Sequence, residues 1–134
     1  MLRYARHCYL AHRAGFEAGR NTPSNVEEQI TLLTFLINHH VHDYLTPITA
    51  AAEAPVNAHS YGELVSGLAW RYLRFSLARG VPEHVEQHEA ALLSYSSAFD
   101  TLTAYVQSGQ LRLPPWAYGN EPRKSARRDH ADGR

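Results

Sequence analysis

Signals that begin and end helices recur along this chain, and they constrain its fold more than any other feature. Ser24 and Ser60 each stand three residues before a glutamate, which is the spacing of a helix-starting capping box. Gly80 and Gly109 stand where a helix can end on a glycine, and Pro82 suits the first turn of the helix that follows. These signals predict four helices, over about residues 2–19, 25–45, 61–79 and 82–108.

The segments between and after these helices predict the rest of the fold. Thr46 and Pro47 either kink the second helix or start a short helix over about residues 47–53. Residues 111–118 suit an extended strap that packs back on the helices, whereas the polar residues after it suit a disordered basic tail. We therefore expect an all-α bundle of four to five helices, with a single helical domain over 1–118 and a flexible tail over 119–134.

The composition excludes several classes of protein. No apolar run approaches the length of about eighteen residues that a membrane span needs. Arg3, Arg6 and His7 interrupt the apolar core that a signal peptide requires. Cys8 is the only cysteine, so an internal disulfide is impossible. We therefore expect a soluble, cytoplasmic protein with no membrane partner.

Charge is unevenly placed, although the formal net charge of the chain is zero. Residues 1–20 hold four Arg and one Glu, residues 21–111 hold nine acidic and three basic residues, and residues 112–134 hold six basic and three acidic residues. Basic ends that flank an acidic body favour self-association or an intramolecular clasp. A protein that binds nucleic acid usually presents a basic domain or stripe, so a nucleic-acid partner is not expected.

Apolar side chains recur with helical spacing and predict the faces that pack. The second and fourth helices each carry one stripe spaced by three and four residues, and the second also carries Leu32, Phe35 and Leu36 beside its stripe. The third helix is apolar around most of its circumference, which implies burial on two sides. Another copy of the chain is the simplest source of the second side, so we expect a homodimer or a higher homo-oligomer.

Histidine and aromatic residues on these helices suggest a pocket. The chain has no glycine-rich phosphate loop and no nucleophile elbow, so no catalysis is identified. Polar aromatic rings between helices can instead line a site for a small-molecule ligand. The first hypothesis is therefore a small binding or interaction module that works as a homo-oligomer, with a ligand pocket lined by His40, Tyr44, Trp70, Tyr72, His88 and Tyr95.

A second hypothesis is a metal-binding bundle, which could also be a metal-dependent enzyme. His39, His42 and Asp43 are neighbours on one helical face, at i, i+3 and i+4. His84 and His88, in "HVEQH", have the i, i+4 spacing by which two imidazoles hold one metal ion. Three or four of these groups around one ion would suit divalent Zn, Fe, Mn or Ni.

A third hypothesis follows from the segment "HDYLTPIT", residues 42–49. It resembles the H-box of histidine-kinase dimerisation domains, in which one helix carries a histidine, an acidic residue and then a Thr-Pro step. The resemblance implies that His42 accepts a phosphoryl group, that Asp43 orients it and that Thr46 holds a phosphatase water. Since no nucleotide-binding domain follows, the resemblance implies a histidine phosphotransfer protein without kinase activity.

The longer segment "NHHVHDYLTP", residues 38–47, also has a structural interpretation. Near a helix C-terminus, the helix dipole stabilises a protonated imidazole by roughly 0.3–1 kcal/mol. We expect His40 and Tyr44 to face inward, and His39, His42 and Asp43 to share a more accessible face.

Overall fold

The computed structural model describes residues 2–19, 24–45 and 47–114 of the 134-residue chain. Over these residues the predicted all-α fold is confirmed. The described part contains no β-strand, and its one isolated β-bridge joins Val56 to Arg112. None of the described helices is long and apolar enough to cross a membrane. The helices are α1 (Leu2–Ala18), α2 (Ser24–Leu45), α3 (Tyr61–Ala78) and α4 (Pro82–Gln107).

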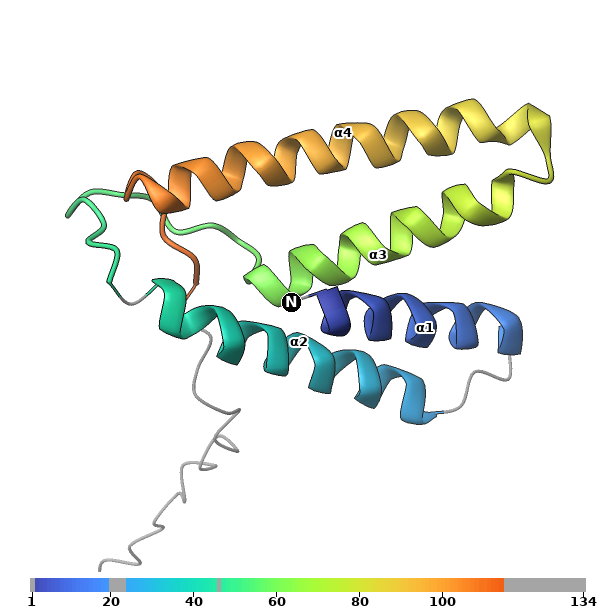
Figure 1. The fold of residues 1–134 in the computed structure, drawn as a ribbon, viewed down its shortest axis with the longest axis horizontal. Helices are drawn as coiled ribbons and strands as arrows, with labels where there is room; N and C mark the ends of the chain where they lie inside the picture. Colours follow the sequence, from blue (N-terminus) through green and yellow to red (C-terminus); the bar gives the residue numbers. More distant parts are fainter. Residues whose placement is uncertain (1, 20–23, 46, 115–134) are drawn as a thin grey trace, which may run out of the picture.

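Helix α3 lies at the centre of the fold (Figure 1). It packs against α1 and α2 on one side and against α4 on the other, and α1 also packs against α2. The apolar residues around most of α3 are thus explained within the chain, because α4, rather than another copy, covers the second apolar face. Any surface for self-association has to be sought on the other helices.

The core is small and centres on the packing of α1, α2 and α3. Cys8, Ile37 and Leu73 are the largest completely buried side chains among the described residues. The buried face of α2 continues from Ile37 to Val41, a step of four residues. Tyr44 stands in the last turn of α2 and is 69% exposed, so the prediction that it turns inward is wrong. His40 is half-buried.

Helix α4 packs through a single face. The stripe predicted for this helix is the face that is turned away from solvent, because its members are half-buried or, in the case of Val106, buried. The acidic residues of α4 are all exposed. The half-buried members of the stripe are Val85, His88, Leu92, Tyr95, Phe99 and Leu102.

A buried amide joins α2 to the first turn of α3. The Asn38 side chain donates from Nδ2 to Ser60 Oγ at 3.0 Å, and its Oδ1 accepts the Gly62 backbone N–H at 2.7 Å. Ser60 and Glu63 form the predicted capping box: Ser60 Oγ accepts the Glu63 N–H, and the Glu63 carboxylate accepts the Ser60 N–H. The equivalent side chain at Ser24 lies outside the described part of the structure.

The short helix predicted over residues 47–53 is not formed, and α2 ends at Leu45. The backbone of the segment that follows α2 bonds instead to the chain after α4. The Ala51 N–H donates to the Gly109 carbonyl at 2.9 Å, and the Arg112 N–H donates to the Pro55 carbonyl at 2.9 Å. These distant partners replace the local i, i+4 partners of a helix, which is why the prediction is wrong.

The predicted strap begins directly after α4. Gly109 has φ +74°, a left-handed conformation that glycine adopts without strain, and its N–H donates to the Val106 carbonyl. The Arg112 guanidinium then donates twice to the Ala54 carbonyl, from Nε at 3.0 Å and from Nη2 at 2.8 Å. Residues 115–118 of the strap and the predicted tail over 119–134 lie outside the described residues.

Replacing Gly62 by alanine should weaken the contact between α2 and α3. A Cβ atom there would meet the carbonyl oxygen of Thr34, which belongs to the α2 backbone and cannot move aside. We expect Gly62→Ala to lower the free energy of unfolding in urea by about 1–3 kcal/mol. Gly80→Ala is the matched control, since a Cβ there meets nothing within 4 Å. Equal urea midpoints for the two variants would contradict this prediction.

Candidate functional site

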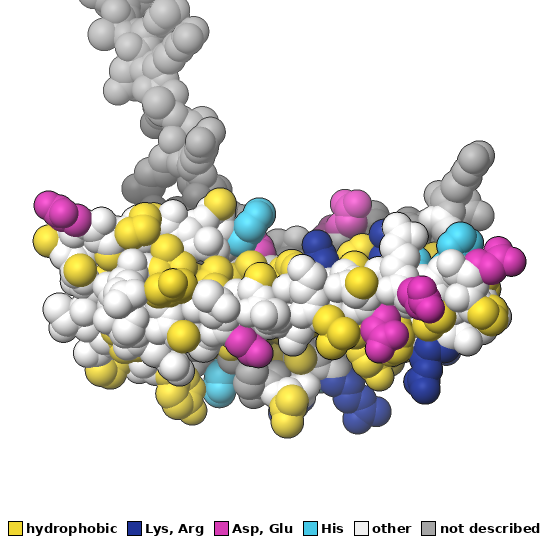
Figure 2. Space-filling model, turned by 90° about the horizontal axis from the view of Figure 1, so that it is seen from above, with side chains coloured by type: hydrophobic (Ala, Val, Ile, Leu, Met, Phe, Trp, Pro, Cys, Tyr) yellow, Lys and Arg dark blue, Asp and Glu magenta, His cyan; other side chains and the backbone are white. Residues whose placement is uncertain are grey.

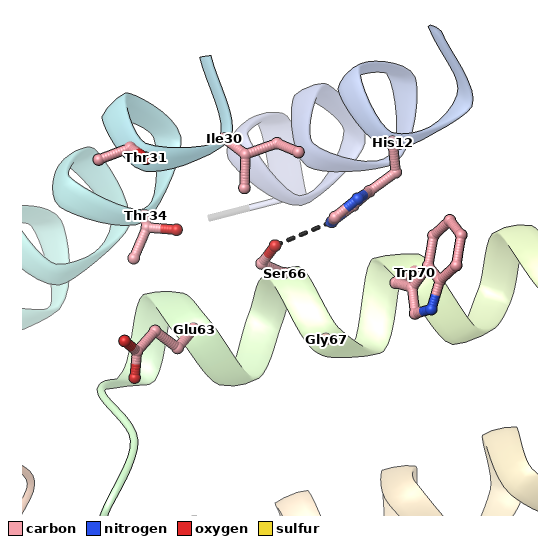
Figure 3. Close-up of a pocket in the computed structure, with 8 residues that line it drawn as sticks. All are labelled: His12, Ile30, Thr31, Thr34, Glu63, Ser66, Gly67 and Trp70. Atoms are coloured by element: carbon pink, nitrogen blue, oxygen red, sulfur yellow. Dashed lines mark hydrogen bonds between the residues drawn. The ribbon is translucent and has the colours of Figure 1, made fainter. Parts of the chain in front are cut away.

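An open groove runs between α1, α2 and α3 (Figure 3). Its volume is about 610 Å³. The side of α3 that faces the groove carries residues at i, i+3, i+4 and i+7, so they lie on one helical face. The lining residues are His12 from α1, Ile30, Thr31 and Thr34 from α2, and Glu63, Ser66, Gly67 and Trp70 from α3.

A hydrogen-bonded pair of side chains links α1 to α3 inside the groove. His12 Nε2 lies 2.9 Å from the Ser66 hydroxyl oxygen, and the His12 ring lies 5.5 Å from the Trp70 ring, centroid to centroid. Figure 3 shows the Thr34 side chain pointing toward Ser66 from α2. Three helices thus bring one imidazole and two hydroxyl groups to the same part of the groove.

Burial sets the charge of His12. Removal of the imidazole from water lowers the pKa of His12 below its ordinary value of 6.5, although contact with Ser66 acts in the opposite direction. The imidazole is therefore neutral at neutral pH. A neutral imidazole has one N–H donor and one bare nitrogen, so it can donate to the Ser66 hydroxyl or accept from it. The groove gains a polar contact here without a positive charge.

Among the described residues, Glu63 is the only Asp, Glu, Lys or Arg whose side chain lines the groove. Its Oε2 accepts the Ser60 N–H at 2.8 Å and lies 3.3 Å from His59 Nδ1. The other end of the α3 face carries Trp70, and the guanidinium carbon of Arg74 lies 5.8 Å from the Trp70 ring centroid. Negative charge therefore stands at one end of this face and an aromatic ring at the other.

Gly67 sits between these two ends of the α3 face. A Cβ at Gly67 would collide with the Tyr95 hydroxyl group, which donates to the Leu64 carbonyl at 3.1 Å. The Arg71 guanidinium carbon lies 3.9 Å from the Tyr95 ring centroid. This glycine thus allows α4 to approach α3 closely behind the groove.

Of the six predicted ligand-pocket residues, only Trp70 lines the groove. The structure distributes the other five over three separate helix contacts. His40 contacts Tyr44 and Tyr4, at 5.5 and 6.0 Å between ring centroids. Tyr72 contacts Tyr9, with 5.6 Å between the ring centroids. Tyr95 lies between α3 and α4, and His88 is half-buried on α4.

The predicted metal ligands lie in two groups that the structure does not bring together. His39, His42 and Asp43 stand near the C-terminal end of α2, whereas His84 and His88 stand near the N-terminal end of α4, at opposite ends of the molecule in Figure 1. His39 and Asp43 are exposed, as predicted, and His42 is half-buried. Among the described residues, no three His, Cys, Asp or Glu side chains lie close enough together to hold one metal ion.

The segment that resembles an H-box differs from that motif in its backbone. The motif keeps its histidine and its Thr-Pro step in one helix, but α2 ends at Leu45 and residues 47–60 are not helical. His42 stands in the last turn of α2. Thr46, the residue expected to hold a water, lies outside the described residues.

His12, Ser66 and Thr34 line the groove, but they are not among the site residues predicted from the sequence. A local signal existed for His12, which follows the buried Cys8 by four residues and so borders the packed face of α1. No local pattern shows that Ser66 and Thr34 meet this histidine, because the three residues come from three helices.

No protein-family model matches the chain, and no curated protein or solved structure matches it significantly. Its function must therefore be inferred from the groove and from the surfaces of the helices.

Acidification should destabilise the fold through His12. Because the pKa of His12 is lower in the folded chain than in the unfolded chain, the unfolded chain takes up a proton first as the pH falls through about 6.5. His12 therefore leaves the free energy of unfolding unchanged above that pH and lowers it as the pH falls below. We expect the urea midpoint to fall further between about pH 7.5 and about pH 5.5 in the wild type than in His12→Gln. An NMR titration that places the His12 pKa above 6.5 would refute this sign.

Proposed function

We propose that this chain is a small helical binding module that works as a homo-oligomer and holds a small ligand in the groove between α1, α2 and α3. The groove is the observation that carries the proposal. Its volume of about 610 Å³ falls within the range of about 300–1,000 Å³ typical of small-molecule sites. Trp70 and Ile30 offer apolar contact, while the His12–Ser66 pair offers a fixed polar contact.

The charges around the groove indicate the class of ligand. Glu63 favours a cationic group at its end, and the neutral imidazole of His12 does not oppose one. Trp70 stands seven residues further along α3, about 10 Å at 1.5 Å per residue. A ligand that reaches both residues therefore has an amine about two helical turns away from an apolar ring. We assign the groove to arylalkyl amines of this length.

Two features of the rest of the chain support the other parts of the proposal. Leu10, Leu32 and Leu93 are 45%, 56% and 62% exposed on three different helices, and each leaves apolar surface that another copy of the chain can cover. The one cysteine, Cys8, is completely buried, and burial raises the pKa of its thiol, so the thiol is inert rather than reactive. A protein without disulfides suits the reducing cytoplasm, which is the location we propose.

A matched pair of probes tests the groove. 4-Phenylbutylamine and 5-phenylpentanoate have the same ring and the same linker, and they differ in the sign of the terminal charge. We expect the amine to shift the Trp70 indole N–H signal in an NMR titration, with that signal assigned from Trp70→Phe. The carboxylate should bind more weakly, and Glu63→Gln should weaken amine binding by roughly two- to fivefold, as expected for one partly exposed charge.

Glu53→Gln is the control for the loss of one negative charge, because Glu53 is exposed and does not line the groove. It should leave the affinity for the amine unchanged. If neither probe shifts the Trp70 signal, the groove does not bind this class of ligand and the ligand part of the proposal is overturned.

A further inference from the structure

The outward face of α1 carries positive charge next to an exposed leucine. Arg3 and Arg6 are exposed, and Leu10, one turn beyond Arg6, is 45% exposed. Their spacing of three and then four residues places all three on one side of the helix. We refer to Arg3, Arg6 and Leu10 as the basic face of α1.

The outward face of α4 carries the opposite charge with the same spacing. Glu86 and Glu89 are exposed, and Leu93, one turn beyond Glu89, is 62% exposed. No Lys or Arg occurs anywhere in α4. Figure 2 looks down on the side of the molecule formed by α4, where acidic side chains are spread along the length and basic side chains are confined to one half. We refer to Glu86, Glu89 and Leu93 as the acidic face of α4.

The two faces match residue by residue. If the helices lie parallel with Leu10 beside Leu93, the shared spacing of three and four residues sets Arg6 beside Glu89. It also sets Arg3 beside Glu86, because both helices rise about 1.5 Å per residue. Two pairs of opposite charges and one apolar pair then face each other over two helical turns, an arrangement that fixes both register and orientation.

The same register makes one unfavourable pair, and the structure already reduces its cost. Glu17 would approach Asp100, which is exposed on α4. Within one chain, however, Arg13 Nε donates to Glu17 Oε1 at 2.8 Å, and both side chains are more than half exposed. Arg13 therefore neutralises the carboxylate that would otherwise repel Asp100.

These two faces cannot meet within one chain. Helix α1 packs against α2 and α3, and α4 packs against α3, so α3 stands between α1 and α4 in Figure 1. We infer that the basic face of α1 docks on the acidic face of α4 of a second copy of this chain, with Leu10 against Leu93. The inference rests on the proposed homo-oligomer and names its contact surfaces. A closed ring of copies uses both faces of every copy.

Charge reversal on each face, followed by mixing, tests the inference. Arg3→Glu/Arg6→Glu and Glu86→Arg/Glu89→Arg should each weaken association of the full chain by roughly tenfold or more, because two attractive pairs become repulsive. An equimolar mixture of the two variants should regain the wild-type mass, since each then presents the face that the other needs. A single chain with all four substitutions should also associate as the wild type does. Sedimentation velocity measures all four samples, and far-UV circular dichroism confirms that each is folded.

Glu28→Arg/Glu53→Arg is the matched control, because it changes the net charge as much as the α4 variant does but alters exposed acids outside both faces. It should associate like the wild type. Raising the salt concentration from about 50 to about 500 mM should weaken wild-type association, because exposed ion pairs are screened.

The outcomes separate the inference from the proposed function. A wild-type chain that is monomeric at all accessible concentrations overturns the homo-oligomer, and the inference falls with it. A wild-type oligomer that survives both charge reversals overturns only the inference. Weakened variants that do not recover on mixing also overturn it, since complementary faces would then not be the cause. Binding in the groove is tested separately by the phenylalkyl probes, because none of the substituted residues lines it.

Discussion

The buried amide of Asn38 determines where α3 begins, and the groove depends on that position. Its two hydrogen bonds, to Ser60 Oγ and from the Gly62 N–H, hold the first turn of α3 against α2. Gly62 allows this close approach because it has no Cβ to collide with the α2 backbone. Ser66 follows one turn later, opposite His12. Loss of the amide would leave the buried Gly62 N–H without its acceptor, a cost of about 1–3 kcal/mol, whereas Ser60 Oγ would still accept the Glu63 N–H.

Helix α4 is held differently, by α3 along one face and by the chain at its C-terminal end. The Schellman arrangement after α4, in which the N–H groups of Gly109 and Gln110 bond back to the last turn, directs the chain toward the segment that follows α2. The two hydrogen bonds from Arg112 to the Ala54 carbonyl then fasten it there. With both attachments on the inner side, α4 packs mainly against α3 among the described helices, and its outward face is exposed.

Local signals predicted the helices well, and distant contacts account for what they missed. The capping box at Ser60 and the glycine at 109 act within a few residues, so the bounds of α3 and α4 can be derived from sequence. The segment after α2 cannot, because its hydrogen-bond partners follow α4. The same limit applies to the site. Trp70 was predicted as a pocket residue from its type, but its neighbour His12 comes from another helix, and that pairing leaves no mark in the sequence.

Helix α1 connects the proposed ligand site to the proposed contact between copies. Its inner side carries His12, which bonds to Ser66 across the groove, and its outer side carries Arg3, Arg6 and Leu10. Because one rigid helix bears both sets of residues, a shift of α1 toward α3 moves both. If association and ligand binding favour different positions of α1, each must weaken the other; if they favour the same position, each must strengthen the other. By thermodynamic linkage the factor is the same in both directions. The affinity for an amine, measured with the wild type and with the charge-reversed α4 chain, would therefore report which position the assembly selects.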